Sequence, residues 1–139
     1  MQIKTERVEN TVGYAFLDKG VYPAYLLDWV PDILDPDNYI KPFLECEEAE
    51  GDRCKKGGSQ SQGSFYNSSE MNELIVNQRK ERDVNKRSQL IQKIQELLAQ
   101  DVPFIPLWQS KEYAFARKGL QGVKIEPNQQ LPYWNIYKQ

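Results

Sequence analysis

The chain has 139 residues, of which 40% are hydrophobic, and its net charge is −2 at neutral pH. This length is typical of one domain with a real core. The acidic balance disfavours nucleic-acid binding, and no apolar run approaches the roughly 20 residues that a membrane-spanning helix needs. Residues 1–10 also lack the apolar core and cleavage site of a signal peptide.

Three elements are predicted before residue 31. Residues 3–8 alternate apolar and polar side chains, which predicts a strand. Residues 10–20 have the apolar spacing of a short helix that ends at Gly20. Residues 21–30, VYPAYLLDWV, are mostly apolar and predict a core strand. Pro23 is tolerable there because it lies near the start of the strand, where a missing amide donor matters little.

An acidic, proline-rich turn follows this predicted strand directly. It contains Pro31, Asp32, Asp35, Pro36 and Asp37. Asp-Pro-Asp-Asn is ordinary turn chemistry, which is the simpler interpretation of Asp35 and Asp37. Asp32 differs by its position three residues after Trp29, at the exit of the strand. Its carboxylate could receive a cationic group while Trp29 packs against the rest of a ligand. The alternative is a turn aspartate that caps nearby amides.

Residues 45–64 are polar and rich in glycine, serine and glutamine, a composition that predicts a flexible loop. Cys46 and Cys54 flank the segment EEAEGDR within it. The two thiols could close a small disulfide, which would indicate an oxidising compartment, or could remain unpaired at the surface. No metal site is expected, because the chain has no histidine and two cysteines supply only half of a tetrahedral zinc shell.

Two consecutive helices are predicted next. The first begins with Asn67 as its cap and Glu70 three residues later, as in a capping box. The second begins at Asp83 and carries apolar side chains at helical spacing: Leu90, Ile91, Ile94, Leu97 and Leu98. Pro103 ends it. The strand-like segments that follow are residues 101–109, 112–119, 122–127 and 132–139. The expected fold class is α+β, with two central helices against a mixed sheet.

The available chemistry argues against an enzyme. Without histidine there is no Ser-His or Cys-His pair, and no Walker phosphate loop is present. We therefore expect no catalytic residue and no cofactor. A hydrolase that uses the carboxylates of Asp32, Asp35 and Asp37 is a remote alternative, because adjacent turn carboxylates rarely hold the fixed separation such chemistry needs.

The order of these segments resembles the C-terminal part of the family 5 extracytoplasmic solute-binding proteins, the oligopeptide, dipeptide and nickel receptors of ABC importers. The most specific pieces are DWVPDILDPDNY, residues 28–39, and KRSQLIQKIQELLAQDVPFIPLW, residues 86–108. The resemblance implies a mixed α/β lobe of a type II periplasmic-binding-protein fold. Residues 1–118 would form part of the second lobe, with an insertion at 45–64. Residues 119–139 would be strands that return toward the first lobe.

The resemblance also implies a function. The chain would be a fragment of a substrate-binding component that delivers peptides or similar small solutes to a membrane permease. In peptide-binding members the aspartate of W-x-x-D pairs with the peptide's α-ammonium; here that residue is Asp32, preceded by Trp29. Phe65 and Tyr66 are weaker candidates for the pocket wall, and covering the core is the simpler interpretation of both. The expected location is periplasmic or otherwise extracytoplasmic, with an export signal upstream of this sequence.

The chain also departs from the family. A full member is several hundred residues long and has a first lobe, so we expect either a piece of a longer protein or a truncated gene product. The segment 131–137 would then lack its strand partner, and its apolar side chains predict self-association or a disordered tail. These side chains are Tyr133, Trp134, Ile136 and Tyr137. The alternative function is a truncated lobe that stands alone as a protein-interaction domain.

Overall fold

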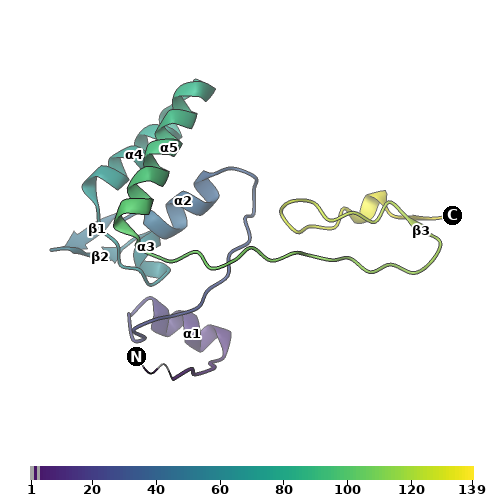
Figure 1. Ribbon diagram of the computed structural model, residues 1–139, viewed down its shortest axis with the longest axis horizontal. Helices are drawn as coiled ribbons and strands as arrows, with labels where there is room; N and C mark the ends of the chain where they lie inside the picture. The colour runs from purple at the N-terminus through teal and green to yellow at the C-terminus, as the bar shows by residue number, and fades with distance from the viewer. Residues whose placement is uncertain (1, 3) are drawn as a thin grey trace.

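The computed structural model describes residue 2 and residues 4–139 (Figure 1). The helices are α1 (Asn10–Leu17), α2 (Asp37–Leu44), α3 (Gly58–Ser61), α4 (Ser69–Lys80), α5 (Val84–Asp101) and the 3-10 helix η1 (Tyr133–Asn135). The strands are β1 (Glu48–Glu50), β2 (Arg53–Lys56), β3 (Leu120–Gln121) and β4 (Tyr137–Lys138). β1 pairs antiparallel with β2, and β3 pairs antiparallel with β4.

The core lies where α2, α4 and α5 meet. Its buried side chains are Ile40, Leu44, Met71, Ile75 and Ile94. We call this unit, together with β1, β2 and α3, the helical body. The helical spacing of α5 predicted its inner face, where Ile94 is buried and the neighbouring apolar residues are partly buried. Each such fully buried side chain contributes about 1.5–3 kcal/mol of hydrophobic stabilisation.

The α+β class is confirmed, but the predicted mixed sheet is wrong. The described residues form two separate two-stranded sheets, and α4 and α5 pack on each other and on α2 instead. Residues 102–118, here called the arm, run extended away from the helical body to the C-terminal hairpin, residues 119–139 (Figure 1). A strand-like sequence pattern does not produce a strand where no neighbouring strand supplies hydrogen-bond partners.

The same reason corrects the individual strand predictions. No strand forms within residues 21–30, 101–109, 112–119 or 122–127. Of the predicted strand 132–139, only Tyr137–Lys138 is a strand, β4, whereas Tyr133–Asn135 is the 3-10 helix η1. Residues 4–8 form no strand either, and Ile3 of that predicted strand lies outside the described residues. The helix predicted over residues 10–20 is confirmed as α1, and Gly20 beyond its end has a φ of +66°.

The helix caps agree with the sequence in one case and differ in the other. Asp83 caps α5, because its Oδ1 accepts a hydrogen bond from Lys86 N at 2.9 Å, as predicted. The cap of α4 is Ser68, whose Oγ accepts from Met71 N at 3.2 Å. Asn67, the predicted cap, instead donates from Nδ2 to the carbonyl of Gly51. The start of α4 is therefore one residue later than the pattern predicted.

Residues 45–64 are structured, so the prediction of a flexible loop is wrong. A disulfide joins Cys46, two residues before β1, to Cys54 of β2, and Cys54 is fully buried. The backbone N–H of Cys46 donates to Asn72 Oδ1 of α4 at 2.9 Å. Ser59 of α3 is also fully buried and donates from Oγ to the carbonyl of Tyr66 at 2.6 Å. Polar residues can build fixed structure when the neighbouring elements satisfy their hydrogen bonds.

Candidate functional site

The turn between residues 29 and 38 holds the two principal candidate residues. Trp29 is half-buried; its indole Nε1 donates to the carbonyl of Asn38 at 3.0 Å. Its ring meets Phe43 of α2 edge-on, with 5.1 Å between ring centroids. Such a T-shaped contact is a favoured aromatic geometry. Trp29 is thus anchored to α2 at two points.

Asp32 lies at the exposed side of the same turn. Its backbone N–H donates to Asn38 Oδ1 at 3.0 Å. Among the residues that the structure describes, its carboxylate has no hydrogen bond or ion pair, and the side chain is exposed. A carboxylate fixed through its main chain and open at its oxygens can accept a cationic group from outside.

Asp35 and Asp37 have structural partners. Asp35 receives a two-point ion pair from Arg87 of α5, with Nη1–Oδ2 and Nη2–Oδ1 distances of 2.8 and 2.7 Å. Its Oδ1 also accepts from the backbone N–H of Asp37 at 2.8 Å, at the start of α2. The hydrogen bond from Arg87 lowers the pKa of Asp35 below its ordinary value, against an opposing effect of desolvation. Asp37 pairs with Arg79 of α4 at 3.3 Å.

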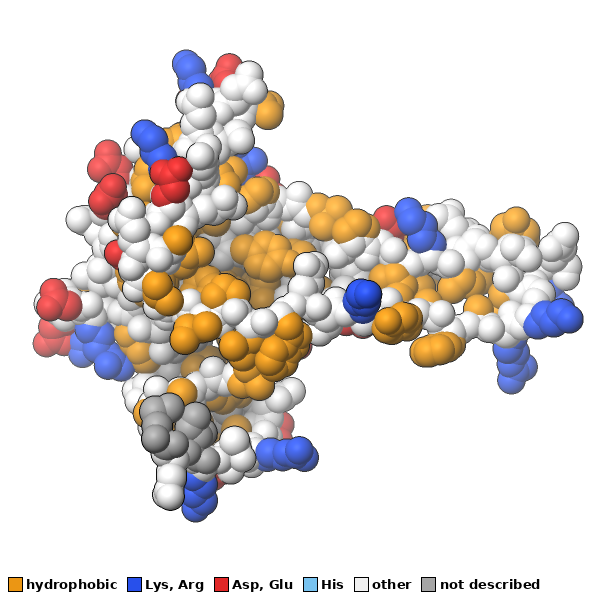
Figure 2. Space-filling view, viewed as in Figure 1, with side chains coloured by type: hydrophobic (Ala, Val, Ile, Leu, Met, Phe, Trp, Pro, Cys, Tyr) orange, Lys and Arg blue, Asp and Glu red, His pale blue; other side chains and the backbone are white. Residues whose placement is uncertain are grey.

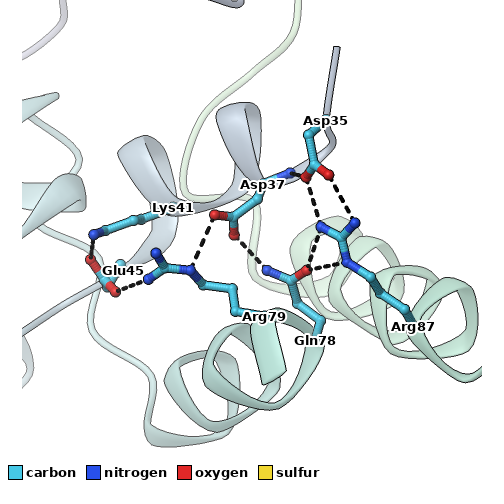
Figure 3. Close-up of polar contacts among 7 residues, drawn as sticks. All are labelled: Asp35, Asp37, Lys41, Glu45, Gln78, Arg79 and Arg87. Carbon is cyan, nitrogen blue, oxygen red and sulfur yellow. Dashed lines mark hydrogen bonds and ion pairs between the residues drawn. The ribbon is translucent and has the colours of Figure 1, made fainter. Parts of the chain in front are cut away.

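A buried glutamine connects these two ion pairs (Figure 3). Gln78 of α4 is fully buried. Its Nε2 donates to Asp37 Oδ1, and its Oε1 accepts from Nε and Nη2 of Arg87 at 3.2 and 3.1 Å. Both ends of the carboxamide are therefore satisfied, as burial requires. Figure 3 shows that this network joins the N-terminal end of α2 to both long helices.

Phe65 and Tyr66, the two weaker candidates, contact different residues from those that Trp29 and Asp32 contact. The guanidinium of Arg53 lies over the Phe65 ring, 3.7 Å from its centroid, and Phe65 itself has a φ of +53°. The hydroxyl of Tyr66 donates to Asp101 Oδ2 at the end of α5, at 2.5 Å. Burial, together with that hydrogen bond, raises the pKa of Tyr66 to about 12. Their assignment as pocket wall stays a prediction.

Two clefts lie beside the 29–38 turn. A polar cleft of about 430 Å³ is lined by Ile33 and by charged residues of the Figure 3 network. An apolar cleft of about 500 Å³ lies between α2 and α5, and Pro31, Leu34 and Phe104 contribute to its wall. Figure 2 shows hydrophobic side chains gathered where the arm leaves the helical body. Of the two neighbours of Asp32, Ile33 borders the polar cleft and Pro31 the apolar cleft. None of the four predicted ligand residues lines either cleft.

Sequence reasoning missed three residues that organise this region: Asn38, Gln78 and Arg87. Asn38 stands in the DPDN turn, so its presence was noted, but nothing in the pattern indicated that it receives bonds from both Trp29 and Asp32. Gln78 and Arg87 lie on two helices whose side chains meet only after packing. Helical periodicity predicts an inner face but not which polar side chains will meet there.

No helix in residue 2 and residues 4–139 is both long enough and apolar enough to cross a membrane. Within the same residues, no group of three or more potential metal-ligating side chains comes together.

No protein-family model matches the chain, but individual curated proteins match most of it. A dipeptide-binding protein of Pseudomonas aeruginosa is 26% identical over 120 residues, which are 86% of this chain and 21% of that protein. The probable D,D-dipeptide-binding periplasmic protein DdpA of Escherichia coli is 25% identical over 125 residues, or 90% of this chain and 23% of that protein. Di/tripeptide-binding protein 4 of P. aeruginosa is 30% identical over 108 residues, 78% of this chain and 19% of that protein.

The matched proteins define a class, that of peptide-binding proteins, some of them named as periplasmic. The chain spans about a fifth of the length of these curated relatives. The matches confirm the resemblance that the segment order indicated: the chain is similar to the C-terminal part of the family 5 extracytoplasmic solute-binding proteins.

Proposed function

We propose that this chain is part of the substrate-binding component of an ABC importer and contributes to the binding of peptides or similar small solutes. It acts without catalysis, and its partners are the solute and the permease subunits at the membrane. Its similarity to dipeptide-binding and di/tripeptide-binding proteins supports this role. The disulfide between Cys46 and Cys54 supports an oxidising, extracytoplasmic location.

One observation carries the assignment of the binding residue. The carboxylate of Asp32 is exposed and unpartnered among the described residues, while its backbone is fixed to α2. It would receive the α-ammonium of a peptide as a charge-assisted hydrogen bond. Trp29, anchored beside it, would pack against the rest of the ligand. Phe65 and Tyr66 remain secondary candidates. In this proposal residues 1–118 belong to the second lobe, with 45–64 inserted, and 119–139 return toward the first.

The test is peptide binding by the complete gene product that carries these residues, measured by titration calorimetry. The ligands are di- and tripeptides with a free amino terminus and their N-acetylated forms. Asp32→Asn keeps the shape but removes the charge. It should weaken binding of the free peptides about 10- to 100-fold, since a hydrogen bond to a charged group contributes about 1.5–3 kcal/mol.

The matched control is Asp52→Asn, a substitution of an exposed aspartate in the β1–β2 turn. It should leave peptide affinity unchanged. Equal affinities of the wild type and the Asp32→Asn variant would remove Asp32 from the site, and a wild type that binds none of the peptides would overturn the proposed substrate class.

A second candidate function, a protein-interaction domain, is favoured by a different observation. The arm exposes large apolar side chains, with Trp108 73% and Phe115 95% accessible. Exposed apolar surface of this kind often marks a protein-binding face. A partner that co-purifies with the wild type and is lost in a Trp108→Ser, Phe115→Ser variant would support this role, whereas co-purification unaffected by both substitutions would exclude the arm as its surface.

A further inference from the structure

We propose that Asn38 is a positioning residue for ligand binding, which sets the Asp32 carboxylate and the Trp29 ring in one fixed relation. This inference rests on the proposed function, because it assigns Asn38 a role through those two residues. Asn38 lies in the first turn of α2, six residues after Asp32 and nine after Trp29. It receives a hydrogen bond from each of them.

The two bonds use different atoms of Asn38. The side-chain Oδ1 accepts the backbone N–H of Asp32, and the main-chain carbonyl accepts the indole Nε1–H of Trp29, both at 3.0 Å. Because the backbone N–H of Asp32 is a donor, the atom that faces it must be the oxygen of the carboxamide and not its nitrogen. A third bond, from Asn38 N–H to the carbonyl of Asp35 at 3.0 Å, closes the turn.

Asn38 is itself held by rigid elements. The residue before it, Asp37, is bonded to Gln78 and Arg79 of α4, and Asp35 is paired with Arg87 of α5. The 29–38 turn is therefore connected to the helical body through α2 and through these ion pairs. A site is effective only when its ligand residues are held close to the productive geometry by neighbouring groups. The Oδ1 of Asn38 supplies that support to Asp32, whose own side chain remains open.

The first experiment measures the bond itself. Hydrogen exchange at the backbone amide of Asp32 should be slow in the wild type and fast in Asn38→Ala, which removes the acceptor. Asn38→Asp keeps an oxygen at the same position and should restore slow exchange. The matched control is Asn128→Ala, because the Oδ1 of Asn128 accepts a hydrogen bond from the backbone N–H of Gln130 in a different turn. This variant should leave exchange at the Asp32 amide slow. Rapid exchange of the Asp32 amide in the wild type would overturn the inference.

The second experiment is a double-mutant cycle on peptide affinity in the complete gene product. Asn38→Ala should weaken binding of peptides with a free amino terminus about three- to tenfold, as expected for one hydrogen bond. It should have little effect on N-acetylated peptides, so the selectivity between the two falls. In an Asp32→Asn background, Asn38→Ala should cause no further loss, because residues that act as a unit are non-additive.

The outcomes separate this inference from the proposed function. If Asp32→Asn weakens binding and Asn38→Ala does not, the positioning role is wrong while the ligand role of Asp32 stands. If Asn38→Ala lowers the affinities for free and acetylated peptides equally, Asn38 serves the fold alone and the inference is overturned. If Asp32→Asn itself has no effect, the proposed ligand role fails first and the inference fails with it.

Discussion

At the scale of single residues, the three aspartates of the 29–38 turn have different roles. Asp35 and Asp37 were interpreted from the sequence as turn residues, and their partners give them that structural role: both meet cationic side chains of the long helices. Asp32 alone keeps an open carboxylate. Proximity along the chain therefore did not leave all three carboxylates of this turn free, because two of them are held by ion pairs.

The Asp35–Arg87 ion pair predicts a pH dependence of stability. The hydrogen bond from Arg87 lowers the pKa of Asp35 in the folded state. A lowered folded-state pKa contributes stability that is present above the unfolded pKa of about 3.9 and is lost as the pH falls through the lower folded value. We expect urea denaturation to show this loss below about pH 4 in the wild type.

The comparison protein is Asp35→Asn, which cannot titrate at this position. Its free energy of unfolding should be lower than that of the wild type at neutral pH, by about 1 kcal/mol for a two-point pair near the surface. The difference between the two proteins should shrink toward acid. A difference that stays constant from neutral pH to pH values below about 3 would contradict the lowered pKa.

At the scale of elements, the start of α4 shows how local chemistry chooses among adjacent candidates. Both Asn67 and Ser68 are good caps by type, and the pattern with Glu70 favoured Asn67. In the structure, Asn67 Nδ2 donates a hydrogen bond to the carbonyl of Gly51, and Ser68 caps the helix. The cap in the structure is thus one residue later than the cap that the pattern favoured.

The two residues give a direct test of the cap. Ser68→Ala should lower the free energy of unfolding by about 1 kcal/mol, as loss of a helix cap does. Asn67→Ala should cost less, because its bond to Gly51 is exposed. Chemical denaturation of both variants measures the two values. A larger loss for Asn67→Ala would favour the cap that the sequence predicted.

The disulfide at the β1–β2 hairpin should make the stability of the chain depend on reducing agent. The disulfide closes a short loop of eight residues' separation, and the chain-entropy model gives about 2–3 kcal/mol for a loop of that size. Reducing agent should therefore lower the stability of the wild type by about that amount. A Cys46→Ala, Cys54→Ala variant should be unaffected by the reductant. Equal denaturation midpoints for oxidised and reduced wild type would show that the bond adds nothing.

At the scale of the whole molecule, exposed aromatic side chains distinguish the C-terminal hairpin from the helical body. Tyr133, Trp134 and Tyr137 are 72%, 83% and 62% accessible. Within residue 2 and residues 4–139, β4 pairs with the two-residue strand β3 and with no other strand, so its other edge is open there. Open strand edges with apolar side chains promote pairing with another chain.

We therefore expect this 139-residue chain, when isolated, to self-associate through residues 131–137. Sedimentation equilibrium should show a mass that rises with concentration, and Trp134→Glu should lower it. Trp108→Glu, which changes a similarly exposed tryptophan on the arm, is the matched control and should leave the mass unchanged. A strictly monomeric wild type with an ordered 131–137 segment would contradict the expectation.

What the sequence determined by itself is local structure and the order of motifs along the chain. The apolar spacing of α5, its Asp83 cap and the short helix α1 could be read without a structure, because each depends on neighbours within a few residues. The resemblance could be read as well, because it needs only the order of segments in the sequence. The position of Asp32 after Trp29 was equally legible. The tertiary structure alone decided whether extended segments found strand partners, and residues 21–30 did not. It alone brought Gln78 and Arg87 to the 29–38 turn, and it decided that Asn38, within that turn, receives bonds from both Trp29 and Asp32. Pairing and polar contact join residues far apart in the chain, and no local pattern encodes that meeting.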